Sequence, residues 1–230
     1  MGTPARYDPA MFKSVFESSF TYISGFRRNV HRFSSRPAIH SPDTGQSLSY
    51  AELGARVDKV AAGLARLGAE SGDVVTYQLT NRVEFALLYL ATQQSGMIGS
   101  PINFRLSPGE TAYILDDSQP RIYVYDASYA GTAAAALELC SHRPEVVMAV
   151  GEPDEVTVLP GALDFESLLD TAGPDPMTPT RAPTAGGPAG AWAGSWAGSI
   201  YEETTRLYTS GTTGLPKGVP LNSLVEVLSA

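Results

Sequence analysis

The sequence has a single cysteine, no long apolar run and no recognisable targeting segment. Cys140 is the only cysteine among 230 residues, so an intrachain disulfide is excluded. It ends an alanine-rich stretch, and we interpret it as a small buried hydrophobe, not a nucleophile. No apolar stretch approaches the roughly 20 residues that span a bilayer, and no signal-peptide pattern opens the chain. We therefore expect a cytoplasmic protein, with no membrane association by default.

Charge is also scarce. Charged residues make up 17% of the chain, and hydrophobic residues make up 43%, whereas ordinary globular proteins are about 25% charged. The 16 basic and 24 acidic residues give a net charge of −8 without any basic run. Nucleic-acid binding is therefore not expected. The composition favours buried strands over disorder, and the length allows one large or two small domains.

Segments typical of strands alternate with segments typical of helices between residues 34 and 150. Strands are expected over 34–39, 47–50, 73–79, 97–102, 121–125 and 145–150. Helices are expected over 50–66, 82–95, 108–117 and 127–140. The first two strands flank a turn-forming Pro-Asp-Thr-Gly sequence and should form a hairpin. The later alternation predicts an α/β fold with a mostly parallel sheet and helices on both faces.

Three helix starts carry a local signature. Ser49, Asn81 and Ser107 are each followed three positions later by glutamate, the spacing of a capping box. Gly68 and Gly96 stand where the first two of these helices should end. These signals predict the helix boundaries from local chemistry alone.

Apolar residues recur at helical spacing over 11–26, and Arg27 and Arg28 follow them. An amphipathic helix packed on its own domain is the favoured interpretation. A membrane-surface or targeting helix is the alternative, although Glu17 weakens the targeting version. We expect one helix over this segment.

The segment 173–199 has a different composition. Of its 27 residues, 17 are Gly, Pro or Ala, and both tryptophans lie in a tandem Trp-Ala-Gly-Ser. Such a segment buries too little surface to fix one conformation, so we predict a flexible insertion. A lid or a partner-docking segment is the alternative. The predicted organisation is an α/β region over 1–172, the insertion over 173–199, and the truncated start of a second α/β region over 200–230. This last part should contain a strand, a loop and the start of a helix near Asn222.

Residues 208–218 have the chemistry of a polyphosphate-binding loop. They read Tyr-Thr-Ser-Gly-Thr-Thr-Gly-Leu-Pro-Lys-Gly, after what looks like the end of a strand. Glycines let backbone N–H groups approach an anion. Ser210, Thr212 and Thr213 supply hydroxyl donors, and Lys217 supplies a mobile positive charge.

Two other interpretations of this loop are weaker. A plain surface turn needs one or two special residues, not a run of nine. The P-loop of nucleotide triphosphatases requires a glycine before its lysine and a hydroxyl residue after it. Counting from Gly211, those two places hold Pro216 and Gly218. The sequence therefore indicates a different kind of phosphate loop.

Residues 208–219 resemble the signature loop of the AMP-forming adenylating enzymes, which include acyl-CoA synthetases, adenylation domains of peptide synthetases, and luciferases. The sequences of four short segments are also similar to those of acyl-CoA synthetases, at residues 48–53, 72–75, 81–85 and 101–106. The resemblance covers most of residues 36–150 and then residues 204–230. It implies the N-terminal part of an acyl-CoA synthetase fold.

The resemblance implies a ligase that joins a carboxylic acid, most simply a fatty acid, to CoA. ATP and Mg2+ would serve an acyl-adenylate step, and CoA would accept the acyl group. The catalytic positions would be Lys217 and Thr212, with Lys217 as a charged stabiliser and not a base. No protein metal ligand is assigned. The residues implied to hold the pyrophosphate of ATP are Thr209, Ser210, Gly211, Thr212, Thr213, Gly214 and Lys217.

Other family motifs are missing from these 230 residues. The family's Tyr-Gly-x-Thr-Glu and Thr-Gly-Asp stretches and its C-terminal lysine would lie beyond Ala230, and Ser71-Gly72-Asp73 is a turn by context. Leu221-Asn222 stands where many members have Thr-His, so the acid is not identified. We expect an N-terminal fragment that is inactive and poorly soluble alone.

Two alternatives to this assignment remain open. One is an adenylation domain for aryl or amino acids, and the other is a non-catalytic half that pairs with a separate C-terminal polypeptide. The expected substrates are small molecules in each enzymatic case.

Overall fold

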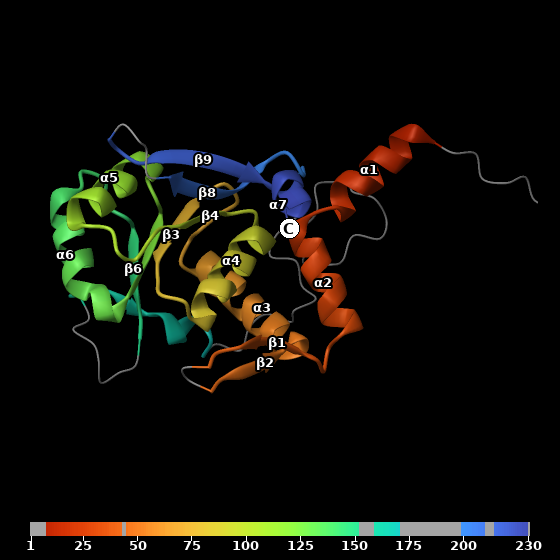
Figure 1. Cartoon of the computed structure of the whole chain (residues 1–230), viewed down its shortest axis with the longest axis horizontal. Helices are drawn as coiled ribbons and strands as arrows, with labels where there is room; N and C mark the ends of the chain where they lie inside the picture. Colours follow the sequence, from red (N-terminus) through yellow and green to blue (C-terminus); the bar gives the residue numbers. More distant parts are fainter. Residues whose placement is uncertain (1–7, 43–44, 152–158, 171–198, 210–213, 230) are drawn as a thin grey trace, which may run out of the picture.

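The computed structural model describes residues 8–42, 45–151, 159–170, 199–209 and 214–229. Within them the chain forms one large sheet covered by helices, with a small hairpin and a helical N-terminal segment beside it (Figure 1). None of the described helices is both long and apolar enough to cross a membrane.

The large sheet contains seven strands and confirms the predicted fold class. In spatial order they are β7 (Leu163–Asp164), β6 (Val146–Val150), β5 (Ile122–Asp126), β3 (Val74–Gln78), β4 (Ile98–Pro101), β8 (Glu203–Thr209) and β9 (Lys217–Asn222). All neighbouring pairs are parallel except β8 and β9. In the register of the central strands, Val75 of β3 lies opposite Gly99 on β4 and Ile122 on β5.

Helices cover both faces of this sheet, as expected for parallel strands. Helices α3 (Tyr50–Arg66) and α4 (Val83–Ser95) pack on one face, and α5 (Pro108–Ser118) and α6 (Ala130–Leu139) pack on the other (Figure 1). Strands β3 and β5 are buried along their whole length. Their β-branched and aromatic side chains therefore contribute to two hydrophobic cores, one on each face of the sheet.

The helix caps follow the sequence in two cases of three. Ser49 and Ser107 each form a complete capping box with the glutamate three residues on. The prediction for Asn81 was wrong, because Arg82 is the N-cap of α4 and makes no side-chain cap bond. Gly68 and Gly96 both have positive φ beyond helix ends, as predicted.

The N-terminal helix was wrongly predicted as one element. The chain forms α1 (Pro9–Ser19) and α2 (Tyr22–Arg32), and the Thr21 side chain caps the second helix by accepting a hydrogen bond from the Ser24 amide. Helix α2 packs on the domain, where Ile23 and Phe26 are buried. Helix α1 lies at the edge of the molecule (Figure 1).

Three smaller features complete the N-terminal region. Strands β1 (Pro37–His40) and β2 (Ser47–Ser49) form the predicted antiparallel hairpin. The helix expected over 127–140 begins as a 3-10 turn, η1 (Ala127–Tyr129), before α6. Cys140 is buried, and burial raises the pKa of its thiol, in agreement with a packing role.

The sequence did not predict several elements near the C-terminal part. Strand β7 and the 3-10 helix η3 (Phe165–Leu168) follow β6. The helix expected to begin near Asn222 forms as α7 (Ser223–Ser229), but strand β9, which comes between the loop and this helix, was not predicted. The segment 173–199, predicted as an insertion, lies outside the described residues except for its last position.

Candidate functional site

The predicted phosphate loop joins two antiparallel strands at one edge of the sheet. Strand β8 leads into it and β9 leads out, with Thr209 directly opposite Lys217 and Tyr208 opposite Gly218. Directly opposed residues in such a ladder have Cα atoms about 4.5–5.5 Å apart. The first and the last of the predicted phosphate-binding residues therefore meet at the base of one hairpin.

The direction of the sheet places this hairpin loop where ligands usually bind. Strand β8 runs parallel to β4, and β4 runs parallel to β3. The loop therefore leaves the carboxyl ends of the parallel strands. Open α/β sheets bind their ligands outside that edge.

Three of the seven predicted binding residues are described. Thr209, Gly214 and Lys217 are exposed around the hairpin, so their polar groups are accessible to a ligand. The other four, Ser210, Gly211, Thr212 and Thr213, lie outside the described residues. Lys217 and Thr209 are directly opposed on neighbouring strands, and an ammonium with a hydroxyl is a combination suited to phosphate oxygens.

Two glycines are required by the backbone here. Gly214 has a φ of +132°, a conformation that other residues rarely adopt. At Gly218, an added Cβ would lie 3.2 Å from the Tyr208 ring. Gly218 therefore lets the ring of Tyr208 lie directly against β9.

Tyr208 ties the hairpin to the rest of the fold. Its hydroxyl donates a hydrogen bond of 2.6 Å to the carboxylate of Asp117, near the end of α5. Burial, followed by this bond and the charge of Asp117, raises the pKa of Tyr208 well above its usual value. Earlier on the same strand, Arg206 pairs with Glu203 through two bonds of 2.7 and 2.8 Å. No local pattern in the sequence predicts the Tyr208–Asp117 contact, because it joins residues far apart in the chain.

A buried carboxylate ties the other end of the hairpin to α4. Glu226 of α7 accepts hydrogen bonds from Thr205 (2.5 Å), Gln93 (3.0 Å), Thr204 (3.1 Å) and Tyr89 (3.2 Å). All four donors are neutral, so within the described residues this carboxyl group is surrounded by dipoles and not by a cation. This network links α4, β8 and α7, and sequence reasoning missed it.

Another polar cluster lies at the point where the strand order reverses, between β3 and β5. Asp126 accepts hydrogen bonds from Thr80 (2.7 Å) and Arg82 (3.3 Å), and Arg82 also contacts Glu84 at 3.0 Å. Burial would raise the pKa of Asp126, but bonds from Ser128 and Thr80 and the charge of Arg82 lower it. This crevice is a common ligand site in such folds, but these side chains already bind one another.

The described residues contain no preformed cluster of metal ligands. Nowhere in the part of the chain that the structure describes do three His, Cys, Asp or Glu side chains gather in a group suited to a metal. Protein-bound Mg2+ is usually held by one or two carboxylates together with substrate phosphates. We therefore assign no step to a metal held by these residues.

The chain belongs to the AMP-binding enzyme family, whose model matches residues 26–225. The match includes the phosphate loop, the Asp126 cluster and the start of α7. The assignment agrees with the resemblance carried by residues 208–219.

Curated relatives are CoA ligases for chemically different acids. The long-chain-fatty-acid–CoA ligase FadD13 of Mycobacterium tuberculosis is 31% identical over 182 residues, covering 79% of this chain and 31% of that protein. The sulfoacetate–CoA ligase of Cupriavidus necator is 29% identical over 187 residues, covering 81% and 31%. This chain thus spans about a third of the length of these relatives.

Solved structures show the same fold. The anthranilate CoA ligase AuaEII, solved with anthranoyl-AMP, matches with a TM-score of 0.71 and 21% identity, over 88% of this chain and 35% of that one. At this level of identity the likeness establishes the architecture alone.

Proposed function

We propose that this chain carries the ATP pyrophosphate-binding hairpin of an AMP-forming acid–CoA ligase. The observation that carries the proposal is the pairing of Thr209 with Lys217 at the carboxyl edge of the sheet, in a chain matched by the AMP-binding family. The proposed division into residues 1–172, 173–199 and 200–230 keeps this hairpin in the last segment.

The reaction that this site would serve has two steps. A carboxylate oxygen attacks the α-phosphorus of ATP, a new oxygen–phosphorus bond forms, and pyrophosphate leaves. The sulfur of CoA then attacks the acyl carbon, and AMP leaves. The first step places negative charge on the departing pyrophosphate, so donors fixed around it lower the barrier.

Each described residue has a proposed part in that first step. Lys217 would offset charge on the β- and γ-phosphates, and Thr209 would donate its hydroxyl to a phosphate oxygen. Gly214, with its positive φ, would let backbone N–H groups turn toward the same anion. Thr212, which lies outside the described residues, would add a further hydroxyl, as would Ser210 and Thr213; Gly211 would give backbone access.

The proposed acid is a fatty acid, because the FadD13 relative is a long-chain-fatty-acid ligase. Aryl acids are the alternative, since the loop over 208–219 does not distinguish a ligase for fatty acids from one for aryl acids. The 230 residues alone should adenylate poorly, since the resemblance places adenine and ribose contacts later in the family's sequence. Pairing with a separate C-terminal polypeptide is a further arrangement consistent with a chain that spans a third of its relatives.

Nucleotide binding tests the hairpin directly. We would titrate ATP into the chain by calorimetry and compare Lys217→Ala and Thr212→Ala with Lys13→Ala, a matched change at an exposed lysine of α1. Loss of a charge-assisted phosphate contact should weaken ATP binding about tenfold or more. The Lys13 variant should bind like the original chain. Equal affinity in all four proteins would sink the proposal.

A second assay tests which acid is the substrate and whether the 230 residues act without a further polypeptide. Pyrophosphate release is measured with a panel of fatty and aryl acids, first with this chain and then with the chain mixed with a C-terminal ligase polypeptide. Activity only on mixing supports the two-polypeptide arrangement, and the preferred acid identifies the substrate class. Vigorous turnover by the 230 residues alone would contradict the expected inactivity.

A further inference from the structure

Helix α1 is a part of the chain that the enzyme fold does not explain. The family match begins at residue 26, so all of α1 precedes it. In Figure 1 α1 extends from one end of the molecule, beside α2 and away from β5 and β6. Its side chains therefore have a different environment from those of the helices that cover the sheet.

Apolar side chains of α1 are exposed to solvent. Met11 is 64% exposed, Phe12 is 55% exposed and Phe16 is 37% exposed. The rings form a row along the helix, with centroids 6.1 Å apart for Phe12 and Phe16 and 4.6 Å apart for Phe16 and Phe20. Large apolar residues grouped in this way on a surface usually mark a site of interaction.

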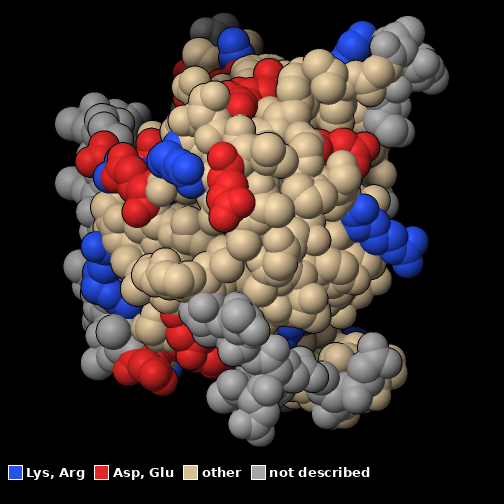
Figure 2. Space-filling model, turned by 90° about the vertical axis from the view of Figure 1, so that its left-hand side faces the viewer, with Lys and Arg blue, Asp and Glu red and all other residues tan. Residues whose placement is uncertain are grey.

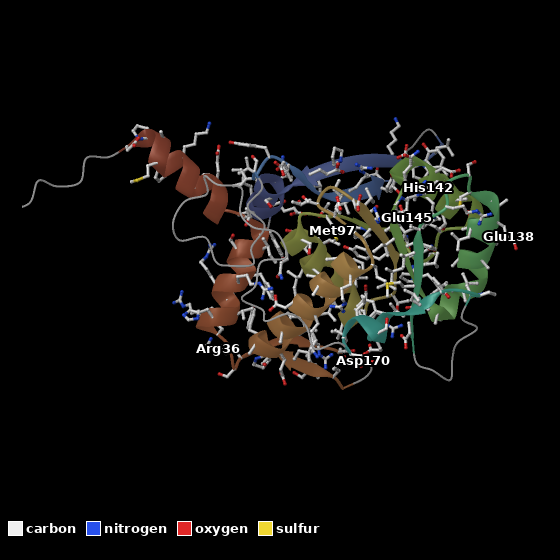
Figure 3. All side chains as sticks on the ribbon, turned by 180° about the vertical axis from the view of Figure 1, so that it is seen from behind. Arg36, Met97, Glu138, His142, Glu145 and Asp170 are labelled. Carbon is white, nitrogen blue, oxygen red and sulfur yellow. The ribbon has the colours of Figure 1, made fainter. Side chains whose placement is uncertain are left out.

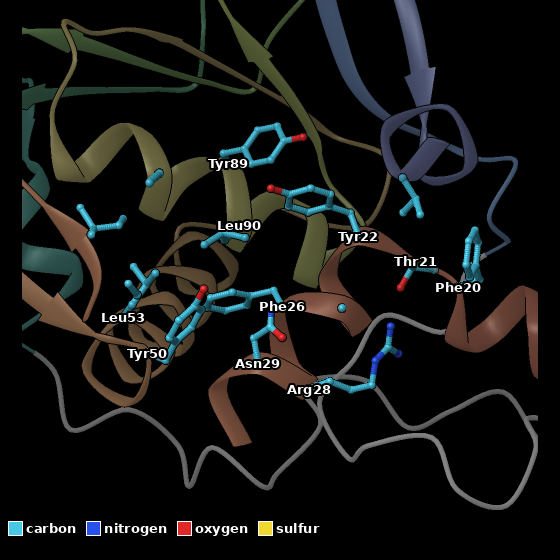
Figure 4. Close-up of a pocket in the computed structure, with 15 residues that line it drawn as sticks. Phe20, Thr21, Tyr22, Phe26, Arg28, Asn29, Tyr50, Leu53, Tyr89 and Leu90 are labelled. Carbon is cyan, nitrogen blue, oxygen red and sulfur yellow. The ribbon is translucent and has the colours of Figure 1, made fainter. Parts of the chain in front are cut away.

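The row continues into an apolar cleft. Phe20 lines a cleft of about 450 Å³ together with Tyr22 and Phe26 of α2 and residues of α3, α4 and α7 (Figure 4). Arg28 and Asn29 belong to the same lining. Aromatic surface and basic groups thus occur together at this end of the molecule.

Charge is strongly segregated along the sequence. Residues 1–36 contain six Lys or Arg and two Asp or Glu, a net charge of +4. The remaining residues contain ten and 22, a net charge of −12, which accounts for the total of −8. The N-terminal segment is therefore a basic region on an acidic protein.

Most of the basic side chains described in this segment are exposed to solvent. Arg28, Arg32 and Arg36 are exposed, and Arg36 is labelled at the same end of the molecule as α1 and α2 in Figure 3. Arg27 differs, because it is bound to Asp58 and Gln94. On the α5–α6 end, by contrast, acidic and basic side chains are interspersed (Figure 2).

We propose that α1 and the exposed arginines that follow it dock this protein onto an anionic lipid bilayer. Interfacial helices insert Phe and similar residues into the headgroup boundary, while nearby Lys and Arg attract anionic lipids. A lipid surface fits better than an acidic protein, because the aromatic row lies on a projecting helix and needs no complementary groove.

The acidic remainder of the protein defines the orientation. Electrostatic attraction acts over a Debye length of about 10 Å at 0.1 M salt, so only the nearby basic segment contributes strongly. The negative body is repelled, which turns α1 toward the bilayer. The docking reverses our expectation of no membrane association and is independent of the chemistry proposed for the hairpin.

Vesicle co-sedimentation of the full chain tests the docking. One set of vesicles is pure phosphatidylcholine, and the other contains about one third phosphatidylglycerol, an anionic lipid. Partition into the anionic vesicles should be about tenfold stronger or more, and should fall as salt rises toward roughly 1 M. Equal binding to both vesicles, or no binding to either, would overturn the proposal.

Paired variants separate the apolar and the basic contributions. Phe12→Ser with Phe16→Ser is compared with Leu139→Ser and Leu163→Ser, two exposed leucines elsewhere. Arg32→Glu with Arg36→Glu is compared with Arg105→Glu and Arg143→Glu, which change net charge equally. Each α1–α2 variant should lose about tenfold or more in partition, and neither control should change it by more than about twofold.

Sedimentation velocity tests the alternative that the aromatic row of α1 binds a second copy of the chain and not a bilayer. A second copy of the chain would give a concentration-dependent dimer that the Phe12 and Phe16 changes abolish. That result without vesicle binding would assign the row to self-association and overturn the lipid proposal. Thermal melts of all variants identify any that do not fold, and an additional variant, Met11→Ser, gives an independent test of the row.

Discussion

The centre of the sheet and the β8–β9 hairpin are built differently. Every residue of β3 and β5 is buried, whereas the first four residues of β9 are exposed. The central strands are held by side chains packed on both faces. The hairpin is held at its two ends by polar contacts, Tyr208 with Asp117 and Glu226 with its four donors.

This difference separates stability from chemistry. Buried apolar area is the main source of folding free energy, so the centre should dominate the stability of the protein. An exposed edge hairpin leaves hydroxyl and ammonium groups available to a ligand. The candidate site therefore lies at a part of the sheet whose side chains are exposed and not packed in a core.

The largest effect should come from the centre. Leu88 of α4 is fully buried in the core on one face of the sheet. Leu88→Ala removes apolar contacts and leaves a cavity, so we expect a loss of about 2–5 kcal/mol in the free energy of unfolding. Urea denaturation measures this loss.

Leu139→Ala provides the matched control. Leu139 lies at the end of α6 and is 63% exposed, so its truncation should change stability by less than about 0.5 kcal/mol. Similar losses for both leucines would mean that the centre is not the stabilising region, and the comparison would fail.

A smaller and more local effect should follow from Glu226→Gln. The amide places N–H donors where Thr204, Thr205, Tyr89 and Gln93 already donate. We expect a loss of about 1.5–3 kcal/mol, with faster amide hydrogen exchange in β8 and β9 than in β3 and β5.

The exposed Glu202→Gln is the control for this change, and it should alter neither stability nor exchange. If the Glu226 variant raised exchange equally in the central strands, the hairpin would not be a separately held unit. The contrast between the two regions would then disappear.

Local signals in the sequence predicted the central region well. The capping boxes at Ser49 and Ser107 depend on residues three positions apart, and their helices formed as expected. The buried β-branched and aromatic runs of β3 and β5 likewise needed no distant information. The resulting α/β class and parallel sheet were therefore predictable.

The hairpin was harder to predict for physical reasons. Strand β9 is exposed and contains Gly218 and Pro220, residues that normally argue against a strand. Proline is tolerated in β9 because it is the edge strand. At Asn81 the cap failed because Glu84 binds Arg82 instead.

The anchors of the candidate site depend on long-range contacts that no local pattern encodes. The sequence identified the loop residues that begin with Thr209 and end with Lys217. It did not show that these two residues pair across a ladder, because that register follows from β9. Tyr208 and Asp117 lie 91 residues apart in the sequence, and only the folded chain brings them within hydrogen-bond distance.

The smallest predicted effect concerns that last contact and its pH dependence. Tyr208→Phe removes a hydrogen bond to Asp117 and should cost about 1 kcal/mol at neutral pH. Burial and Asp117 raise the pKa of Tyr208 in the folded protein above the value of about 10 expected when unfolded. A raised pKa contributes stability that is complete below pH 10 and is lost as pH rises further. The difference in melting temperature between the original chain and Tyr208→Phe should therefore be constant from pH 7 to about 9 and shrink above about 10. Tyr201→Phe, at a tyrosine that is 59% exposed, should show no such narrowing. A difference that stays constant into the alkaline range would mean that Asp117 does not hold the Tyr208 proton, and the hairpin would then need another anchor at this end.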